Sequence, residues 1–357
     1  MAETAGTKPK PKRKLLQKQT VMRRVLFALV PTVAGAVYFF GWYCLFIIVL
    51  ANVTGFITEY IFTSRNNKPA TESVFVTGTL FGLIMPPSVP WYVVVIGMVF
   101  GVMFAKMVFG GFGKNVFNPA IAARAFVYVC FPVAMTGTWA QVAQGPLGAL
   151  NKWTTADSAQ AVSGATPMAY LKSGQIKLSS AETAQSQIPF GLEQDQTVEL
   201  KRTALLRGLI FGRMAGTAGV TSVILILLGG IYLFVTKTAS RTTILSLIIF
   251  YALWNEILYR FGVHPVPGAW PAVLGGGFLF GAFFMATDPV SSPKTELGKI
   301  FYAFIIATAT VVIRNFSIFN GGLMFAILIG NMFTPTIDSI VKDYQSKKKK
   351  PIKKQIP

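Results

Sequence analysis

The feature that most constrains this chain is a series of apolar runs, most of them about as long as a helix that crosses a lipid bilayer. Such a helix needs roughly 20 mostly apolar residues. We place ten of these runs, at about 24–40, 42–62, 73–86, 90–109, 117–135, 215–236, 242–260, 269–287, 299–314 and 320–335. The chain is 53% hydrophobic and only 13% charged, as expected for a protein that lies mainly in lipid. The sequence therefore predicts an all-α, polytopic membrane protein of about ten transmembrane helices.

Basic residues indicate how these spans are oriented. The chain has a formal net charge of +20, and its lysines and arginines gather at the two ends and in alternate connections. With a cytoplasmic amino terminus these connections lie inside, as the positive-inside rule requires. The residues concerned are Arg65, Lys68, Lys114, Lys237, Arg241, Lys294 and Lys299. We expect a multi-pass protein of the inner (cytoplasmic) membrane, with both termini cytoplasmic, that contacts membrane lipids and binds no nucleic acid.

The ten spans divide into two groups of five around one long polar segment. An odd number of spans in each half gives the halves opposite orientations. A weak similarity supports the repeat, because each half has a glycine-rich apolar run that leads into Asn118-Pro119 or Asp288-Pro289. The expected divisions are a basic cytoplasmic tail at 1–23, a first half at 24–135, an extracytoplasmic loop with its lead-in at 136–214, a second half at 215–338 and a basic cytoplasmic tail at 339–357.

The residue count excludes metal-based electron carriers built by this chain alone. It has two cysteines, Cys44 and Cys130, and one histidine, His264. These are too few for a four-cysteine iron–sulfur cluster or a bis-histidine haem. We assign no residue to a metal. If the protein handles electrons, it needs an organic cofactor.

One motif in the outer loop, AVSGATPMAYLK, leaves a threonine hydroxyl open. Small residues precede Thr166, and Pro167 restrains the backbone just after it. Two interpretations are open at this point. Thr166 is either the N-cap of a short helix whose first residue is Pro167, or a hydroxyl that an enzyme can reach and modify.

Longer stretches of the chain resemble one family of membrane proteins. VFGGFGKNVFNPA, VSGATPMA, GGGFLFGAFFMATDPVSSP and NGGLMFAILIGNMFTPTID are similar to the membrane subunit shared by the sodium-translocating NADH:quinone reductase (its B subunit) and the Rnf electron transport complex (its D subunit). The resemblance runs from about Met22 to Asp338. It implies two inverted five-helix repeats like those of urea channels, and an electron-transfer subunit of an ion-translocating oxidoreductase complex, without complete activity alone.

The resemblance also implies a cofactor and its attachment site. In the family, the threonine of this motif carries FMN through a phosphoester bond that a separate flavin transferase makes. Carried over here, the FMN-bearing residue is Thr166. The frame that the transferase recognises is formed by Ser163, Gly164, Ala165 and Pro167, whereas Gln160 stands where the family often has an acid. A second, non-covalent flavin such as riboflavin, or a quinone, is implied for some members. The alternative is a flavin-free channel or transporter of related fold.

Ionisable residues inside the spans are costly, so each suggests a function. Asp288, Arg124 and Lys106 are candidates for an ion or flavin role. A cap on a helix turn is the alternative for Asp288. For Arg124 and Lys106 the alternative is a side chain that extends to the cytoplasmic surface.

Four other charged residues have plain structural explanations. Glu256 and Arg260 lie four apart and are expected to pair along one helix. Glu72 opens the third span, where the helix dipole stabilises an acid. Glu59 lies close to Arg65 near an inner helix end, and we expect it to be solvated.

Two departures from the family bear on ion transport. Val220 replaces a glutamate at the start of the sixth span, and Met107 follows Lys106 where sodium-pumping members tend to have a glutamate. An ion path needs oxygen ligands. The cation route therefore lies in other subunits, or this member transfers electrons without pumping sodium itself.

Overall fold

The protein is a bundle of helices long and apolar enough to lie in a membrane. The computed structural model describes residues 15–137, 139–156, 166–179, 181, 184–189, 191–192, 196–317, 319 and 321–349. Five helices qualify as membrane spans by length and hydropathy: α1 (Thr20–Phe40), α2 (Trp42–Arg65), α9 (Arg241–Arg260), α12 (Glu296–Phe316) and α13 (Gly322–Lys349). Shorter apolar helices are α3 (Ser73–Leu83), α4 (Trp91–Val102), which continues as the π-helix η1 (Met103–Met107), α5 (Pro119–Cys130) and α8 (Val223–Val235). The prediction of a helical, polytopic membrane protein is confirmed.

Two of the predicted spans differ from single helices with the predicted bounds: the eighth is interrupted and the sixth begins late. The eighth, at 269–287, consists of α10 (Ala269–Leu274), α11 (Phe278–Phe280) and the π-helix η3 (Gly281–Met285). Gly276 and Gly277 form its break, with φ of +55° and +72°, a conformation open mainly to glycine. The sixth span was predicted to begin at 215, but its helix, α8, begins at Val223.

The non-helical stretch before α8 packs against the end of α3 inside the protein. The amide of Ala218 donates to the carbonyl of Met85 at 3.0 Å, and that of Gly219 to the carbonyl of Leu83 at 2.7 Å. Irregular backbone is tolerated at membrane depth only where protein or a cavity satisfies its polar groups. These hydrogen bonds meet that condition.

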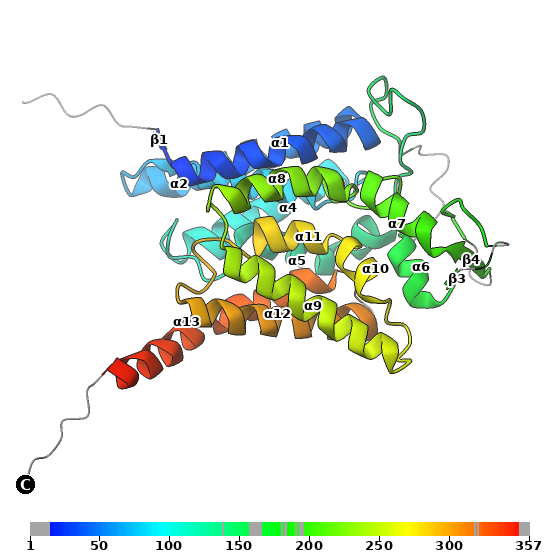
Figure 1. Cartoon of the computed structure of the whole chain (residues 1–357). Coiled ribbons are helices and arrows are strands. Elements are labelled where there is room, and N and C mark those ends of the chain that lie inside the picture. Colours follow the sequence, from blue (N-terminus) through cyan, green and yellow to red (C-terminus); the bar gives the residue numbers. More distant parts are fainter. Residues whose placement is uncertain are drawn as a thin grey trace, which may run out of the picture.

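The same packing pattern occurs twice along the chain. In the first half α4 packs against both α2 and α5 (Figure 1), and α3 packs on α2. In the second half α12 packs against both α9 and α13, and α10 packs on α9. The halves meet where α1 contacts α8 and where α5 contacts α13.

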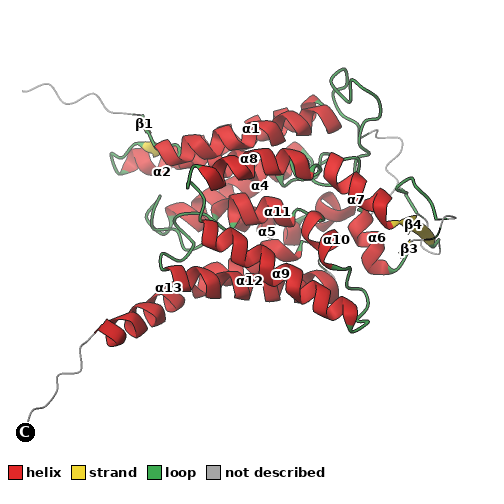
Figure 2. Cartoon of the chain, in the orientation of Figure 1, coloured by secondary structure: helices red, strands yellow, loops and turns green. Residues whose placement is uncertain are grey.

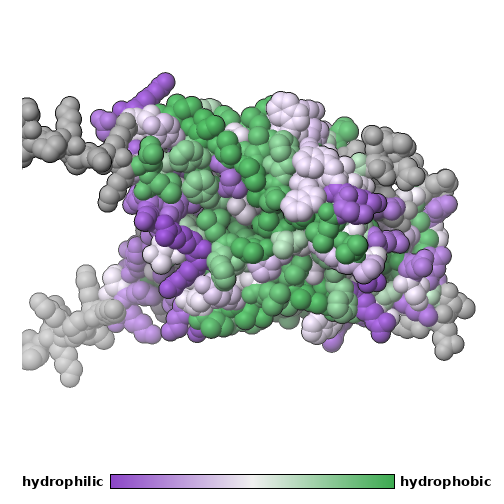
Figure 3. Space-filling view, turned by 90° about the horizontal axis from the view of Figure 1, so that it is seen from above, coloured by the Kyte–Doolittle hydropathy of each residue, from purple (hydrophilic) through white to green (hydrophobic). Residues whose placement is uncertain are grey.

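The ends of the bundle differ from its middle. In the space-filling view, apolar residues cover the middle of one face and polar residues gather toward its two ends (Figure 3). The short strand β1 (Leu16–Gln17) and the last turns of α13 lie at one end, and the segment with α6, α7, β3 and β4 lies at the other (Figure 1). The described chain therefore begins and finishes at the same end of the bundle.

The segment at the opposite end, here called the outer domain, has secondary structure of its own. It contains α6 (Pro167–Ser173), β3 (Ile176–Ser179), β4 (Val198–Lys201) and α7 (Arg202–Phe211), around a small core that includes Tyr170, Leu200 and Leu205. β3 and β4 pair in parallel, as do β1 and β2 (Ala70–Thr71) (Figure 2). The all-α prediction is therefore wrong in detail, because each pair adds a short ladder at an end of the bundle.

Two further helical segments differ from their predicted bounds. The π-helix η2 (Val133–Gly137) extends the region of α5 toward the outer domain. α13 runs on to Lys349, so residues 339–349, predicted as part of a basic tail, continue the last helix, and their side chains from 342 to 348 are exposed.

Candidate functional site

Thr166 begins helix α6 and lies at the junction of the outer domain with the bundle. Its hydroxyl accepts a hydrogen bond from the amide of Ala169 at 3.4 Å, and Pro167 is the first residue of the helix. Thr166 therefore has the geometry of a helix N-cap, as one of the two interpretations predicted. The predicted recognition residues Ser163, Gly164 and Ala165 lie outside the described residues, as does Gln160.

Thr166 lies on the rim of a cavity between the two halves, here called the outer cavity. Its volume is about 1270 Å³ including the open mouth. The first half contributes α5 and η2, and the second half contributes the α10–α11 break, η3, α12 and α13. Residues from α6 and α7 and residues 214–217 and 220–221 also line it. Apolar and aromatic side chains line most of it, among them Tyr128, Trp139 and Phe280. Such a cavity suits a flat organic ligand.

Two arginines from opposite halves line the outer cavity. Arg124 comes from α5, and its Nε–H is buried with no hydrogen-bond acceptor among the described residues. Arg314 comes from α12, is 8% exposed, and donates from Nη1 to the hydroxyl of Tyr251 at 3.0 Å and to the carbonyl of Ala272 at 3.5 Å. The sequence reasoning missed Arg314. The signal was present, since Arg314 follows the apolar run of α12 and an arginine there is costly.

A smaller side cavity joins Thr166 to a third cation. It is lined by Thr166, Ala169, Lys172 and Arg314 among others. Lys172 donates a hydrogen bond to the carbonyl of Ser317. Burial, and secondly the nearby charge of Arg314, lower the pKa of Lys172. No carboxylate lines either cavity among the described residues, so the surroundings of Thr166 are positive.

A second cavity, here called the inner cavity, lies toward the end of the bundle that holds β1. Its volume is about 660 Å³ including the open mouth, and its polar lining includes Asn115, Asn118 and Asp288. Asp288 accepts from the hydroxyl of Ser291 at 2.8 Å and from the amide of Val290 at 3.3 Å. The predicted turn cap at Asp288 is thus confirmed, while its carboxylate also borders a cavity.

The π-helix η3 separates the two cavities. Gly281 and Met285 line the outer cavity, whereas Phe283 and Phe284 line the inner one. π-Helical turns are rare and often occur at functional sites. The same element therefore contributes to the walls of both cavities.

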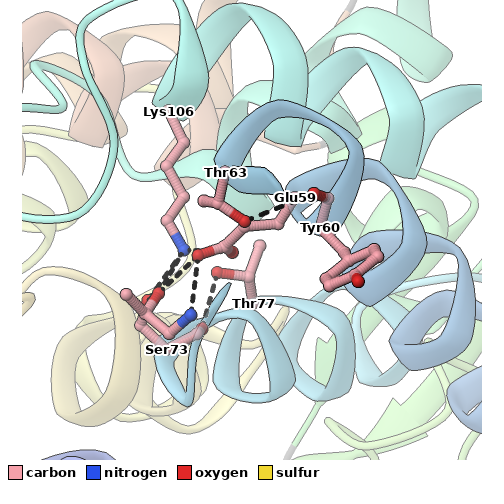
Figure 4. Close-up of polar contacts among 7 residues, drawn as sticks. Glu59, Tyr60, Thr63, Ser73, Thr77 and Lys106 are labelled. Atoms are coloured by element: carbon pink, nitrogen blue, oxygen red, sulfur yellow. Dashed lines mark hydrogen bonds and ion pairs between the residues drawn. The ribbon is translucent and has the colours of Figure 1, made fainter. Parts of the chain in front are cut away.

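Lys106 lies at the edge of the inner cavity in a buried polar cluster (Figure 4). Its Nζ donates to Glu59 Oε2 at 2.6 Å, to Thr71 Oγ1 at 2.9 Å and to Ser73 Oγ at 2.8 Å. Glu59 in turn accepts from the amide and hydroxyl of Thr71 at 2.9 and 2.6 Å. Lys106 and Glu59 are only 2% and 1% exposed. The expectations that Lys106 extends to the surface and that Glu59 is solvated are therefore wrong.

The other charged residues also have partners. Glu256 pairs with Arg260 at 2.9 Å along α9, which confirms that prediction. Glu72 pairs with Arg23 at 2.5 Å and accepts from the amide of Gln19 at 2.6 Å. Glu72 thus has a long-range ion pair in addition to its predicted place at the start of α3, where it is the N-cap residue.

The residues that replace expected glutamates are apolar wall residues. Val220 lines the outer cavity and lies against Gly277, and Met107 packs against the main core. Among the residues that the structure describes, no three His, Cys, Asp or Glu side chains are grouped to hold a metal ion.

The fold and cavities define a class of protein: a polytopic helical membrane protein with cofactor-sized cavities between two halves. Residues 9–347 match the sequence pattern of the NQR2, RnfD, RnfE family. The chain belongs to this family.

Individual relatives are similar over most of the chain. The D subunit of an ion-translocating oxidoreductase complex from Shewanella amazonensis is 33% identical over 340 residues, 92% of this chain and 94% of the relative. The B subunit of a Na(+)-translocating NADH-quinone reductase from Ectopseudomonas mendocina is 34% identical over 315 residues, 87% of this chain and 68% of the relative. The corresponding B subunit from Azotobacter vinelandii is 33% identical over 316 residues, 87% of this chain and 68% of the relative.

Proposed function

We propose that this chain is the membrane electron-transfer subunit of an ion-translocating oxidoreductase complex of the Rnf or Nqr type, and that it relays electrons through FMN esterified to Thr166. Relatives that match nearly its whole length are named as subunits of such complexes. The chain has too few cysteines and histidines for an iron–sulfur cluster or a bis-histidine haem of its own. It therefore works with partner subunits that supply and remove electrons, and a flavin transferase matures it.

The observation that carries the proposal is the position of Thr166. Thr166 lines the outer cavity and the side cavity, and Arg124, Arg314 and Lys172 line one or both of the same cavities. These residues fit FMN, because the phosphate needs cations and the isoalloxazine ring needs a mainly apolar, flat-walled space. When bound, FMN would supply the redox chemistry. The chain's own residues would hold its phosphate, orient its ring and keep water away.

The proposed architecture is two inverted five-helix repeats in the inner membrane. The triplets α2–α4–α5 and α9–α12–α13 pack alike. Asn118, the N-cap of α5, also donates from Nδ2 to the carbonyl of Met285 at 3.4 Å, so the two glycine-rich motifs meet. With basic residues at the end that holds the termini, both termini are cytoplasmic and the outer domain lies on the far side.

The inner cavity is the proposed place for a second, non-covalent flavin or a quinone. Asn115, Asn118 and the ring of Phe283 line it, which gives this cavity polar groups and an aromatic surface. Val220 and Met107 leave fewer oxygen ligands for a cation in this chain. We assign the ion path mainly to partner subunits, with Asp288 as the carboxylate of this chain that borders the inner cavity.

The test is covalent flavin on the denatured chain. The chain is co-expressed with a flavin transferase, separated on a denaturing gel and illuminated with ultraviolet light. We expect a fluorescent band for the wild type and a dark band for Thr166→Asn. Asparagine is the matched control, because it also caps helices well but has no hydroxyl to esterify. A dark wild-type band would favour the flavin-free channel, and fluorescence that survives Thr166→Asn would place the flavin elsewhere.

A further inference from the structure

The outer and side cavities hold three cations and no carboxylate among the described residues. The titratable and charged groups around them are Arg124 and Tyr128 on α5, Lys172 on α6, Tyr251 on α9 and Arg314 on α12. A buried cation without an anion is costly, and buried N–H groups without acceptors are rare. The buried Nε–H of Arg124 is such a group. This arrangement points to a ligand that carries negative charge.

The three cations line the two cavities differently. Lys172 and Arg314 line the side cavity together with Thr166, whereas Arg124 lines only the outer cavity. An ester phosphate on Thr166 has to lie within a few bonds of its hydroxyl, and so beside Lys172 and Arg314. Arg124 shares the outer cavity with the aromatic rings of Tyr128, Trp139 and Phe280, where a planar ligand fits.

Arg314 reaches this position because of the glycine break. A Cβ built on Gly276 would lie 1.4 Å from Nη2 of Arg314, so the guanidinium lies directly over the glycine backbone. The same guanidinium is held from behind by the hydroxyl of Tyr251 at 3.0 Å. The break between α10 and α11 thus makes room for a cation between the two cavities.

We infer that the cations of these cavities bind FMN at two places. Arg314 and Lys172 bind its phosphodiester. Arg124 faces the isoalloxazine and stabilises its reduced, anionic form. The inference rests on the proposed function. Two electrons from the complex and one proton, taken up at N5, convert the oxidised ring to an anion with its charge at N1 and the C2 oxygen. Arg124 supplies the hydrogen-bond donors that this charge needs.

The inference is tested by the potential of the bound flavin, with the FMN-loaded full chain in detergent. Replacing Arg124 by Gln removes the cation. We therefore expect the equilibrium constant for reduction of the flavin to be at least tenfold lower than in the wild type. This lowers the two-electron midpoint potential by about 30 mV or more. Arg124→Lys keeps most of the effect. Arg207→Gln, on the exposed face of α7, is the matched control and leaves the potential unchanged.

The pH dependence of the potential gives a second readout that does not depend on a variant. The wild-type midpoint potential should change with pH with the slope of one proton per two electrons. Arg124→Gln should move it toward two protons, because the ring then gains a proton at N1. A two-proton slope in the wild type, or a fluorescent Arg124→Gln chain with unchanged potential and slope, would overturn the inference. A wild-type chain without covalent flavin would instead overturn the proposed function.

Discussion

Nζ of Lys106 lies 2.6 Å from Oε2 of Glu59, and the two side chains are almost completely buried. Thr71 of β2 and Ser73, the first residue of α3, satisfy the other donors of the ammonium. The cluster therefore joins four elements, α2, β2, the start of α3 and η1, at the edge of the inner cavity. Its charges depend on each other, because neither reaches water.

Removing one member of this pair should destabilise the protein strongly. Lys106→Met leaves Glu59 as an uncompensated buried charge, and we expect a loss of about 3–5 kcal/mol. The double variant Lys106→Met with Glu59→Gln should recover much of that loss. Lys299→Met breaks a pair whose partner, Glu296, is 67% exposed, and should cost less than about 1 kcal/mol. Denaturant unfolding in detergent measures all three. A double variant no more stable than Lys106→Met would show that the pair is not coupled.

The orientation of the protein can be tested with single cysteines. Lys177 on β3 and Lys347 near the end of α13 are exposed and lie at opposite ends of the bundle. In a background without Cys44 and Cys130, an impermeant maleimide should label Lys177→Cys in right-side-out vesicles, and Lys347→Cys only after permeabilisation. The reverse pattern would contradict a cytoplasmic carboxyl terminus, and labelling of both before permeabilisation would contradict an odd number of spans between Lys177 and Lys347.

The ion pair between Glu72 and Arg23 should make the first strand sensitive to acid. The hydrogen bond from Arg23, and then that from the amide of Gln19, lower the pKa of Glu72. A lowered folded-state pKa gives stability that is present above the unfolded value of about 4.3 and is lost as pH falls through the folded value. We expect amide exchange at Leu16–Gln19 to quicken, relative to the intrinsic rate, as the pH falls below about 4. Glu72→Gln should show fast exchange already at neutral pH. Equal protection of the two proteins at neutral pH would rule out this role.

The sequence predicted the positions of the membrane helices well. It predicted poorly the features that depend on packing between segments far apart in the chain. Nine of the ten predicted spans begin within a few residues of the start of a described helix, because a helix in lipid must satisfy its own backbone. The start of α8 was misplaced, since residues 215–222 satisfy their backbone against the end of α3 instead. Thr166 was proposed from its motif, and the structure places it in the lining of a cavity. Arg314, the partner of that site, was missed because its place beside Thr166 depends on contacts between segments far apart in the chain.

The burial of Lys106 and Glu59 could not be predicted for the same reason. Both lie near helix ends, where long charged side chains usually reach water. Only the folding of β2 and the start of α3 over η1 closes that route. Position along a span therefore predicts exposure only where no neighbouring segment covers the helix end.

Replacing Gly276 by alanine should displace Arg314. Any residue other than glycine at φ of +55° costs about 1–2 kcal/mol, and the added Cβ would also lie 1.4 Å from Nη2 of Arg314. The guanidinium has to leave the hydroxyl of Tyr251, a loss of roughly 1.5–3 kcal/mol for a hydrogen bond to a charged group.

Gly262→Ala is the matched control, because Gly262 has a similar φ of +68° and open space around its Cβ position. Unfolding in detergent should therefore show a loss for Gly276→Ala that exceeds the control by about 2 kcal/mol. In a chain that already carries Arg314→Gln, Gly276→Ala should lower the free energy of unfolding by no more than Gly262→Ala does. The reason is that glutamine is too short to reach the glycine. An equal loss for the two glycine variants in the wild-type background would show that Arg314 does not depend on the break.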